Sequence, residues 1–249
     1  MNRYIEIDIL KGIAVFCMII FHIFYYANQY GYKELDYDTF ILRFIAKIAQ
    51  IIFITCVGIN LVISKKNSEE KKESEKVYII KSIKRISKLV FFAICMSLFT
   101  YFVFGDKFVK FGILHFISLS SLLLFMFVDN EKLIKMIIAI LFILYTIIKT
   151  NPLLLNNILP SQLGFIFGFN VNYNSIDHFP IIPWMILLCL GILIGNYITK
   201  NNVKSQIDKN KYILFEKTGK HSLEIYAIHW LVLYAIFTFV YPKFRKNII

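Results

Sequence analysis

The sequence predicts an all-α protein, a polytopic membrane bundle of about seven transmembrane helices. Hydrophobic residues make up 58% of the 249 residues, charged residues only 18%, and the mean hydropathy is +0.64. A soluble domain is typically about half apolar and a quarter charged. The apolar excess lies in blocks close to the ~20 residues that a helix needs to cross a bilayer. We therefore expect residues 1–249 to form a single integral membrane domain.

Seven apolar blocks are candidate spans, and they follow one another along the whole chain. They cover residues 9–28, 41–64, 87–105, 110–128, 132–149, 179–199 and 222–242. A further apolar stretch at 153–169 is interrupted by Asn156, Asn157 and Pro160. We expect this stretch to be re-entrant or to lie in the membrane interface, because an eighth span would move a basic connection to the outside.

The distribution of lysine and arginine predicts the orientation, because these residues mark cytoplasmic loops. Residues 65–88 hold nine basic residues against four acidic ones, and residues 200–220 hold six against two. Both connections face one side if the N-terminus is cytoplasmic, and that side then collects 19 of the 28 Lys and Arg residues. We therefore predict a cytoplasmic N-terminus, with residues 150–178 outside.

The net charge of +12 follows mostly from these basic loops. Anionic membrane lipids are their expected partners, and no aromatic-basic module indicates nucleic acid. The four cysteines lie singly within apolar blocks. Their spacing matches neither a metal site nor a disulfide framework, so we expect them to serve packing. No motif indicates an oligomeric state.

Ionisable side chains inside apolar spans are costly, and they therefore indicate function. His22 lies deep in the first span, and Lys11 lies eleven residues earlier, near its start. Eleven residues make about three helical turns, so the two side chains share a face, roughly 16 Å apart along the axis. Asp8 can pair with Lys11 on the same face. The simpler alternative is an interfacial ion pair and a hydrogen-bonded core histidine, but the alignment favours a face that holds a long ligand at both ends.

Further polar groups lie near the ends of later blocks. His115 lies near the outer end of the fourth block, and Asp177 opens the sixth beside its helix start. His229 lies further inside the seventh block, next to Trp230. The rings of Trp184 and Trp230 fit interface anchoring or packing.

Four stretches carry a resemblance to a known family. They are Glu6-Ile-Asp-Ile-Leu-Lys-Gly-Ile-Ala14 running on to His22, Phe111-Gly-Ile-Leu-His115, Asp177-His-Phe-Pro-Ile-Ile-Pro-Trp184 and Gly219-Lys-His-Ser-Leu-Glu-Ile-Tyr-Ala-Ile-His229. In this order they resemble the prokaryotic branch of the heparan-alpha-glucosaminide N-acetyltransferase catalytic domain family, over nearly the whole chain. The resemblance implies a membrane acyltransferase that uses cytosolic acetyl-CoA, in the plasma membrane of a prokaryote. The glycine-rich stretch that carries the active histidine of the lysosomal enzymes is absent here, so a heparan substrate is not implied.

The first span also resembles that of the wider transmembrane acyltransferases that O-acetylate bacterial polysaccharides. There a basic residue, usually arginine, precedes a histidine by eleven positions, as Lys11 precedes His22 here. The resemblance implies that His22 is a general base or a transient acyl carrier. Asp177 or His115 would orient it from the outer side. The CoA phosphates would lie near a cytoplasmic group formed by Asp8, Lys11 and Arg85.

We therefore predict an enzyme that moves an acetyl or other acyl group from acetyl-CoA to an amine or hydroxyl of a glycan or small acceptor. Two alternatives stay open. A small-solute or proton-coupled transporter could use buried histidines as relay groups, and a family member could be a non-catalytic membrane scaffold. Direct binding of acetyl-CoA separates the first reading from both.

Overall fold

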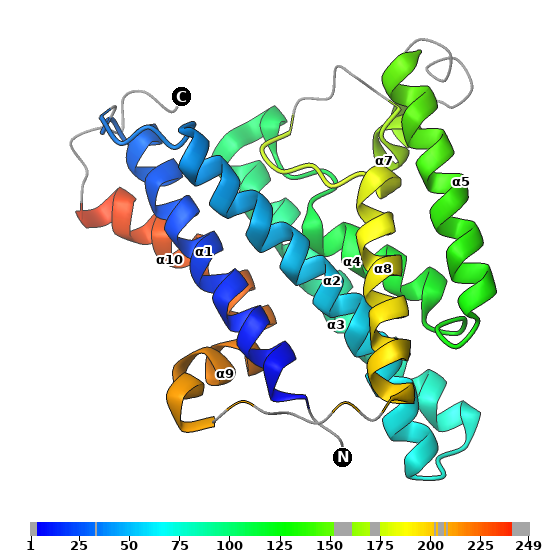
Figure 1. The fold of residues 1–249 in the computed structure, drawn as a ribbon. Coiled ribbons are helices and arrows are strands. Elements are labelled where there is room, and N and C mark those ends of the chain that lie inside the picture. The colour runs from blue at the N-terminus through cyan, green and yellow to red at the C-terminus, as the bar shows by residue number, and fades with distance from the viewer. Residues whose placement is uncertain are drawn as a thin grey trace. The chain divides into compact units, whose positions relative to one another are not determined.

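The computed structural model describes residues 4–32, 34–151, 161–169, 175–201, 203, 207 and 209–240. This part of the chain is almost entirely helical (Figure 1). Its elements are α1 (Ile5–Gln29), α2 (Phe40–Glu70), α3 (Glu75–Phe104), η1 (Gly105–Lys107), α4 (Ile113–Leu124), α5 (Glu131–Thr150), α7 (Ser161–Phe167), α8 (Ile181–Lys200), η2 (Lys209–Tyr212), α9 (Ile213–Lys220), α10 (Ser222–Ala235) and η3 (Ile236–Val240).

Six of the described helices are long and apolar enough to cross a membrane: α1, α2, α3, α5, α8 and α10 with its extension η3. This confirms the predicted all-α, multi-pass membrane protein. The predicted count of seven is not confirmed, because α4 has only 12 residues. A helix of that length is ~18 Å long, whereas the hydrocarbon core is ~30 Å thick.

The chain divides into two compact units. We call residues 57–203 the middle unit, and residues 3–56 together with 204–249 the terminal unit. In the terminal unit, α9 and α10 pack against α1, and in the middle unit α5 packs against α8 and α3 against α4 (Figure 1). Helix α2 contributes its first part to the terminal unit and its last part to the middle unit. The single-domain expectation stays a prediction.

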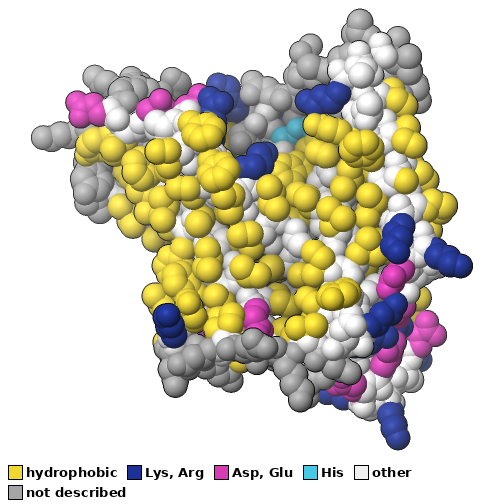
Figure 2. Space-filling model, in the orientation of Figure 1, with side chains coloured by type: hydrophobic (Ala, Val, Ile, Leu, Met, Phe, Trp, Pro, Cys, Tyr) yellow, Lys and Arg dark blue, Asp and Glu magenta, His cyan; other side chains and the backbone are white. Residues whose placement is uncertain are grey.

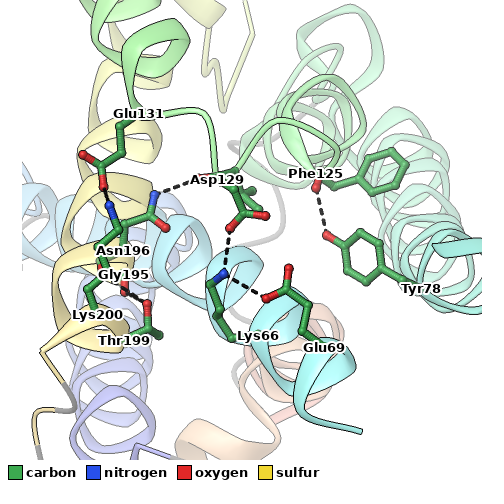
Figure 3. A network of polar contacts seen from close by, with 11 residues as sticks. Lys66, Glu69, Tyr78, Phe125, Asp129, Glu131, Gly195, Asn196, Thr199 and Lys200 are labelled. Carbon is green, nitrogen blue, oxygen red and sulfur yellow. Dashed lines mark hydrogen bonds and ion pairs between the residues drawn. The ribbon is translucent and has the colours of Figure 1, made fainter. Parts of the chain in front are cut away.

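Within the middle unit, α4 returns the chain to the end at which α3 begins (Figure 3). The Tyr78 hydroxyl, near the start of α3, donates to the Phe125 carbonyl oxygen at the end of α4. The Lys66 ammonium, near the end of α2, lies 3.3 Å from the carboxylate of Asp129, which precedes α5. The connection between α3 and α5 therefore reverses the direction of the chain.

The segments that precede α4 and α8 are extended and pair with each other. The amide of Ile176 donates to the Lys107 carbonyl at 3.0 Å, and the amide of Phe179 donates to the Phe111 carbonyl at 2.9 Å. Phe111 and Phe179 are both buried. The segment before α8 thus satisfies two backbone carbonyls of the segment before α4, and irregular backbone in a membrane protein needs such partners.

Glycines mark a helix end and a helix contact in the middle unit. Gly105 has a φ of 55° and ends α3, in a conformation that favours glycine. A methyl group added at Gly58 of α2 would lie 2.1 Å from the Leu188 carbonyl oxygen of α8. Val62, one turn further along α2, lies against Gly195 of α8. These small residues let the two backbones approach closely, as in other membrane helix pairs.

The surface of the helices is apolar along its length. Figure 2 shows hydrophobic side chains over most of the visible helix surface, with charged side chains gathered where α2 ends and α3 begins (lower right). Large side chains such as Phe91, Phe102 and Phe142 are 61%, 82% and 62% exposed. Exposed apolar surface of this extent is expected where lipid surrounds the helices.

Two predicted connections differ from simple loops. Most of residues 65–88 is helical, because α2 and α3 continue to a short turn at 71–74. From the stretch 153–169, residues 161–167 form α7, whose seven residues span only ~10 Å. Residues 152–160 lie outside the described part. A re-entrant or interfacial position for this stretch stays a prediction.

Candidate functional site

Helix α1 carries a buried ion pair near its beginning. The Lys11 ammonium lies 2.8 Å from the Asp8 carboxylate, and their side chains are 15% and 6% exposed. This contact confirms that the two residues pair on one helix face. The carboxylate offsets the lysine charge, so an anion that binds here has to share Lys11 with Asp8.

Helix α9 packs backbone to backbone on the same part of α1. A methyl group added at Gly12 would lie 2.0 Å from the Phe215 carbonyl oxygen, and one added at Gly219 would lie 1.7 Å from the Asp8 carbonyl oxygen. Neither position has room for a Cβ atom. Two glycines, one on each helix, therefore hold α9 against the ion-pair end of α1.

His22 lies within α1 and contacts two residues of α10, His229 and Trp230. Its Nδ1 atom is 2.9 Å from the Met18 carbonyl oxygen and 3.2 Å from Nε2 of His229. His229 is buried, and its own Nδ1 is 2.5 Å from the Tyr226 carbonyl oxygen. A chain of hydrogen bonds thus runs from a carbonyl of α10 through two imidazole rings to α1.

The two carbonyl oxygens determine where the protons of the neutral rings lie. A carbonyl oxygen only accepts, so Nδ1 of His229 carries its proton, and its Nε2 accepts. Nδ1 of His22 then donates, to both Met18 and His229. Nε2 of His22 carries no proton, and none of the hydrogen bonds within the described residues reaches it. His22 therefore presents one open basic nitrogen, which is what a general base requires.

Aromatic side chains surround the His22 ring. The ring centroid of Trp230 lies 4.5 Å from that of His22, and Tyr26 packs edge-on against Trp230 at 5.6 Å. Trp230 and Tyr26 are both buried. In the described part of the chain, neither the Nε1 atom of Trp230 nor the Tyr26 hydroxyl has a hydrogen-bond partner. The region therefore combines the unpaired Nε2 of His22 with two buried polar groups that have no hydrogen-bond partner in the described chain.

His115 of the middle unit has both ring nitrogens occupied. The Gly112 amide donates to its Nδ1 at 3.3 Å, so Nε2 carries the proton and donates to the Ser97 hydroxyl oxygen at 3.2 Å. The Ser97 hydroxyl in turn donates to the Val109 carbonyl at 2.6 Å. This arrangement fastens the segment before α4 to α3. It leaves no nitrogen of His115 open for chemistry.

Asp177 lies just before α8, beside the start of α4. Its carboxylate accepts from the Ile113 amide at 3.3 Å. Burial raises the pKa of Asp177 to about 6, and the hydrogen bond from Ile113 offsets only part of that increase. The neighbouring His178 is anchored to the Phe165 carbonyl at 2.8 Å, and burial lowers the pKa of its ring. Asp177 is therefore a carboxyl group that can exchange a proton near neutral pH.

Arg85 of α3 differs from Lys66 and Lys200 of the middle unit. Its guanidinium donates to the Ser82 hydroxyl at 3.0 Å and to the Lys81 carbonyl at 3.3 Å, and no ion pair joins it to a described carboxylate. In contrast, Lys66 and Lys200 are paired with acidic partners, as Figure 3 shows. The positive charge of Arg85 is therefore more available to an anionic ligand than the charges of Lys66 and Lys200.

The predicted site residues fall into two groups. The terminal unit holds Asp8, Lys11 and His22, and the middle unit holds Arg85, His115 and Asp177. The expectation that Asp177 or His115 orients His22 stays a prediction. His229, which contacts His22, was assigned no role from the sequence. The signal that singled out His22, an ionisable group within an apolar span, applies equally to His229.

Together the fold and these groups define a class: a multi-pass integral membrane protein with two hydrogen-bonded histidines inside its apolar helices. The comparison with known families then names the family. Residues 3–231 match the family described as "Heparan-alpha-glucosaminide N-acetyltransferase, catalytic", and the chain belongs to it. The match includes His22 as well as His229 and Trp230. Comparisons with curated proteins and with solved structures give no match. Membership points to a membrane transferase of the acetyltransferase type.

Proposed function

We propose that this protein transfers an acetyl group from acetyl-CoA to an amine or hydroxyl of a glycan or small acceptor, with His22 as the general base. The observation that carries the proposal is the single open nitrogen of His22. Its Nδ1 is held by the Met18 carbonyl and by His229, while its Nε2 has no partner in the described part of the chain. The family match supplies the reaction type.

In the proposed reaction, Nε2 of His22 accepts the proton of the acceptor amine or hydroxyl as that group attacks the thioester carbonyl carbon. The carbonyl π electrons move to its oxygen. When they return, the carbon–sulfur bond breaks, and the CoA thiolate takes the proton from His22. The imidazolium that forms between these steps keeps its Nδ1 proton bonded to Met18 and His229, and such charge-assisted hydrogen bonds are about twice as strong as neutral ones. His229 is thus the proposed orienting partner of the base.

The donor's phosphates are proposed to lie at the cytoplasmic face of a prokaryotic plasma membrane. Two features support cationic contacts there. Arg85 carries a charge that no described carboxylate offsets, and a guanidinium matches phosphate geometry. Lys11 is held by Asp8 at 2.8 Å, so its proposed role is to bind one phosphate oxygen from a fixed position.

The test is acetyl transfer by the purified protein in detergent. Acetyl-CoA and a panel of amino and hydroxyl acceptors are supplied, and acetylated products are detected by mass spectrometry. We expect His22→Ala to bind acetyl-CoA normally and to lose ~10²- to 10⁴-fold in transfer rate, as is typical for a general base. Ile20→Ala is the control, because this side chain is 43% exposed on the same helix and should leave the rate unchanged. Full transfer per folded molecule in His22→Ala would show that the base is elsewhere.

A further inference from the structure

The indole N–H of Trp230 is a buried donor that has no acceptor in the described chain. The residue is 3% exposed, and its Nε1 atom has no hydrogen-bond partner among the described residues. Leaving a buried polar group unsatisfied costs about 1–3 kcal/mol. Such groups are few in folded proteins, and each one needs an explanation. A ligand that supplies the missing acceptor is one such explanation.

The Trp230 ring lies beside the ring of the proposed base. The Trp230 ring lies 4.5 Å from the His22 ring and 5.8 Å from the His229 ring, centroid to centroid. Tyr25 and Tyr26 complete an aromatic wall, at 6.4 Å and 5.6 Å from Trp230. A hydrogen bond made in such an apolar setting is electrostatically stronger than one made in water.

We propose that the Trp230 N–H binds the carbonyl oxygen of the acyl group and stabilises the negative charge that forms on it during transfer. This inference rests on the proposed function. An indole nitrogen only donates, so its partner must be an acceptor, which excludes an ammonium group and admits an acyl oxygen. When the acceptor attacks, its proton goes to Nε2 of His22 and the carbonyl π electrons go to the oxygen held by Trp230. When the oxygen returns those electrons, the thiolate leaves with the proton from His22.

A trapped water molecule is the competing explanation. The Tyr26 hydroxyl also lacks a partner among the described residues, and a water between it and Trp230 would answer both groups. Buried waters usually make about three hydrogen bonds to such groups. If a bridging water satisfies Trp230, removing the acyl carbonyl oxygen from a ligand should not change its contact with Trp230. The proposed contact, in contrast, requires that oxygen.

The experiment uses two non-transferable analogues of acetyl-CoA that differ only in this oxygen. In the first a methylene replaces the thioester sulfur, which leaves a ketone, and in the second the ketone carbonyl is also reduced to a methylene. We expect the wild-type protein to bind the ketone roughly three- to tenfold more tightly, the usual size of one neutral hydrogen bond. Trp230→Phe keeps an aromatic ring but removes the N–H, so the preference should vanish and kcat should fall ~10²- to 10³-fold. Trp184→Phe, at the only other tryptophan, should keep both.

A second measurement needs no change at Trp230. In protein labelled with ¹⁵N in its indole groups, the two N–H signals are assigned with Trp184→Phe. The Trp230 signal should move downfield with the ketone and stay in place with its reduced counterpart. Equal binding of both analogues by the wild type, or a preference that survives in Trp230→Phe, overturns this inference and leaves the proposed function standing. Binding of neither analogue to the wild type means that the proposed function itself has failed.

Discussion

His22 and His115 are both histidines of apolar helices, yet the structure uses them differently. Both nitrogens of His115 form hydrogen bonds, one with the Gly112 amide and one with the Ser97 hydroxyl. His22 has one nitrogen held and the other open in the described structure. Both side chains are partly buried, so exposure cannot separate the two residues. What separates a structural histidine from a candidate base is the number of ring nitrogens that the protein itself satisfies.

The largest effects are expected from a pair of substitutions that tests this comparison, His229→Leu and His115→Phe. His229→Leu removes the acceptor that holds the protonated His22 ring. A hydrogen bond to a charged group contributes about 1.5–3 kcal/mol, so the transfer rate should fall by about ten- to a hundredfold. His115→Phe removes the acceptor of the Gly112 amide and the donor to the Ser97 oxygen, so it should lower stability by about 1–3 kcal/mol. If His115 has only this structural role, transfer per folded molecule stays unchanged, whereas a loss of transfer would support the predicted orienting role. Thermal unfolding and transfer rate are measured on both variants.

His229→Gln is the matched control, because its side-chain oxygen can accept from Nδ1 of His22 in place of the imidazole nitrogen. It should recover part of the rate that His229→Leu loses. If His229 served packing alone, His229→Leu would keep the higher transfer rate, because leucine fills an apolar site better than glutamine does. Equal rates in the two variants would therefore remove His229 from the proposed mechanism.

The sequence predicted the two histidine regions unequally well, for physical reasons. Composition and the length of the apolar blocks were enough to predict the membrane bundle, and the spacing of Asp8 and Lys11 correctly predicted an ion pair on one face of α1. The same hydropathy concealed the short α4, because an extended segment with Val109 and Phe111 buried is as apolar as a helix. The partner of His22 was concealed by distance: His229 is 207 residues away in the chain. The Met18 and Tyr226 carbonyl oxygens determine which ring nitrogens carry protons. Because these oxygens are backbone atoms, the residue types do not reveal them.

A second, smaller test uses the carboxyl group of the middle unit. The pKa of Asp177 is raised to about 6 in the folded protein, against ~3.9 for an unperturbed aspartate. The folded state therefore holds the proton more tightly than the unfolded state. The contribution of Asp177 to stability is fully present below pH ~4 and is lost as the pH rises through about 6. Asp177→Asn stays neutral at every pH and can still accept from Ile113. Its melting temperature in detergent should exceed that of the wild type at pH 7.5 and match it at pH 4. A lower melting temperature at pH 7.5 would mean that the ionised carboxylate is the form the fold needs.

The smallest expected effect separates a free charge from a paired one in the first half of α3. Arg85 has no described carboxylate partner, whereas the Lys81 ammonium lies 2.5 Å from the Glu73 carboxylate and is already engaged. Arg85→Gln should therefore weaken CoA binding, by up to about fivefold, because an exposed ion pair contributes only about 0–1 kcal/mol. Lys81→Gln should change the affinity less, since it removes a charge that Glu73 already offsets. Calorimetric titration at ~0.05 M and ~0.5 M salt should show the difference shrinking at the higher concentration, because exposed charges are screened over shorter distances there. Equal losses for the two variants at low salt would indicate a diffuse basic surface that attracts CoA without a specific contact at Arg85.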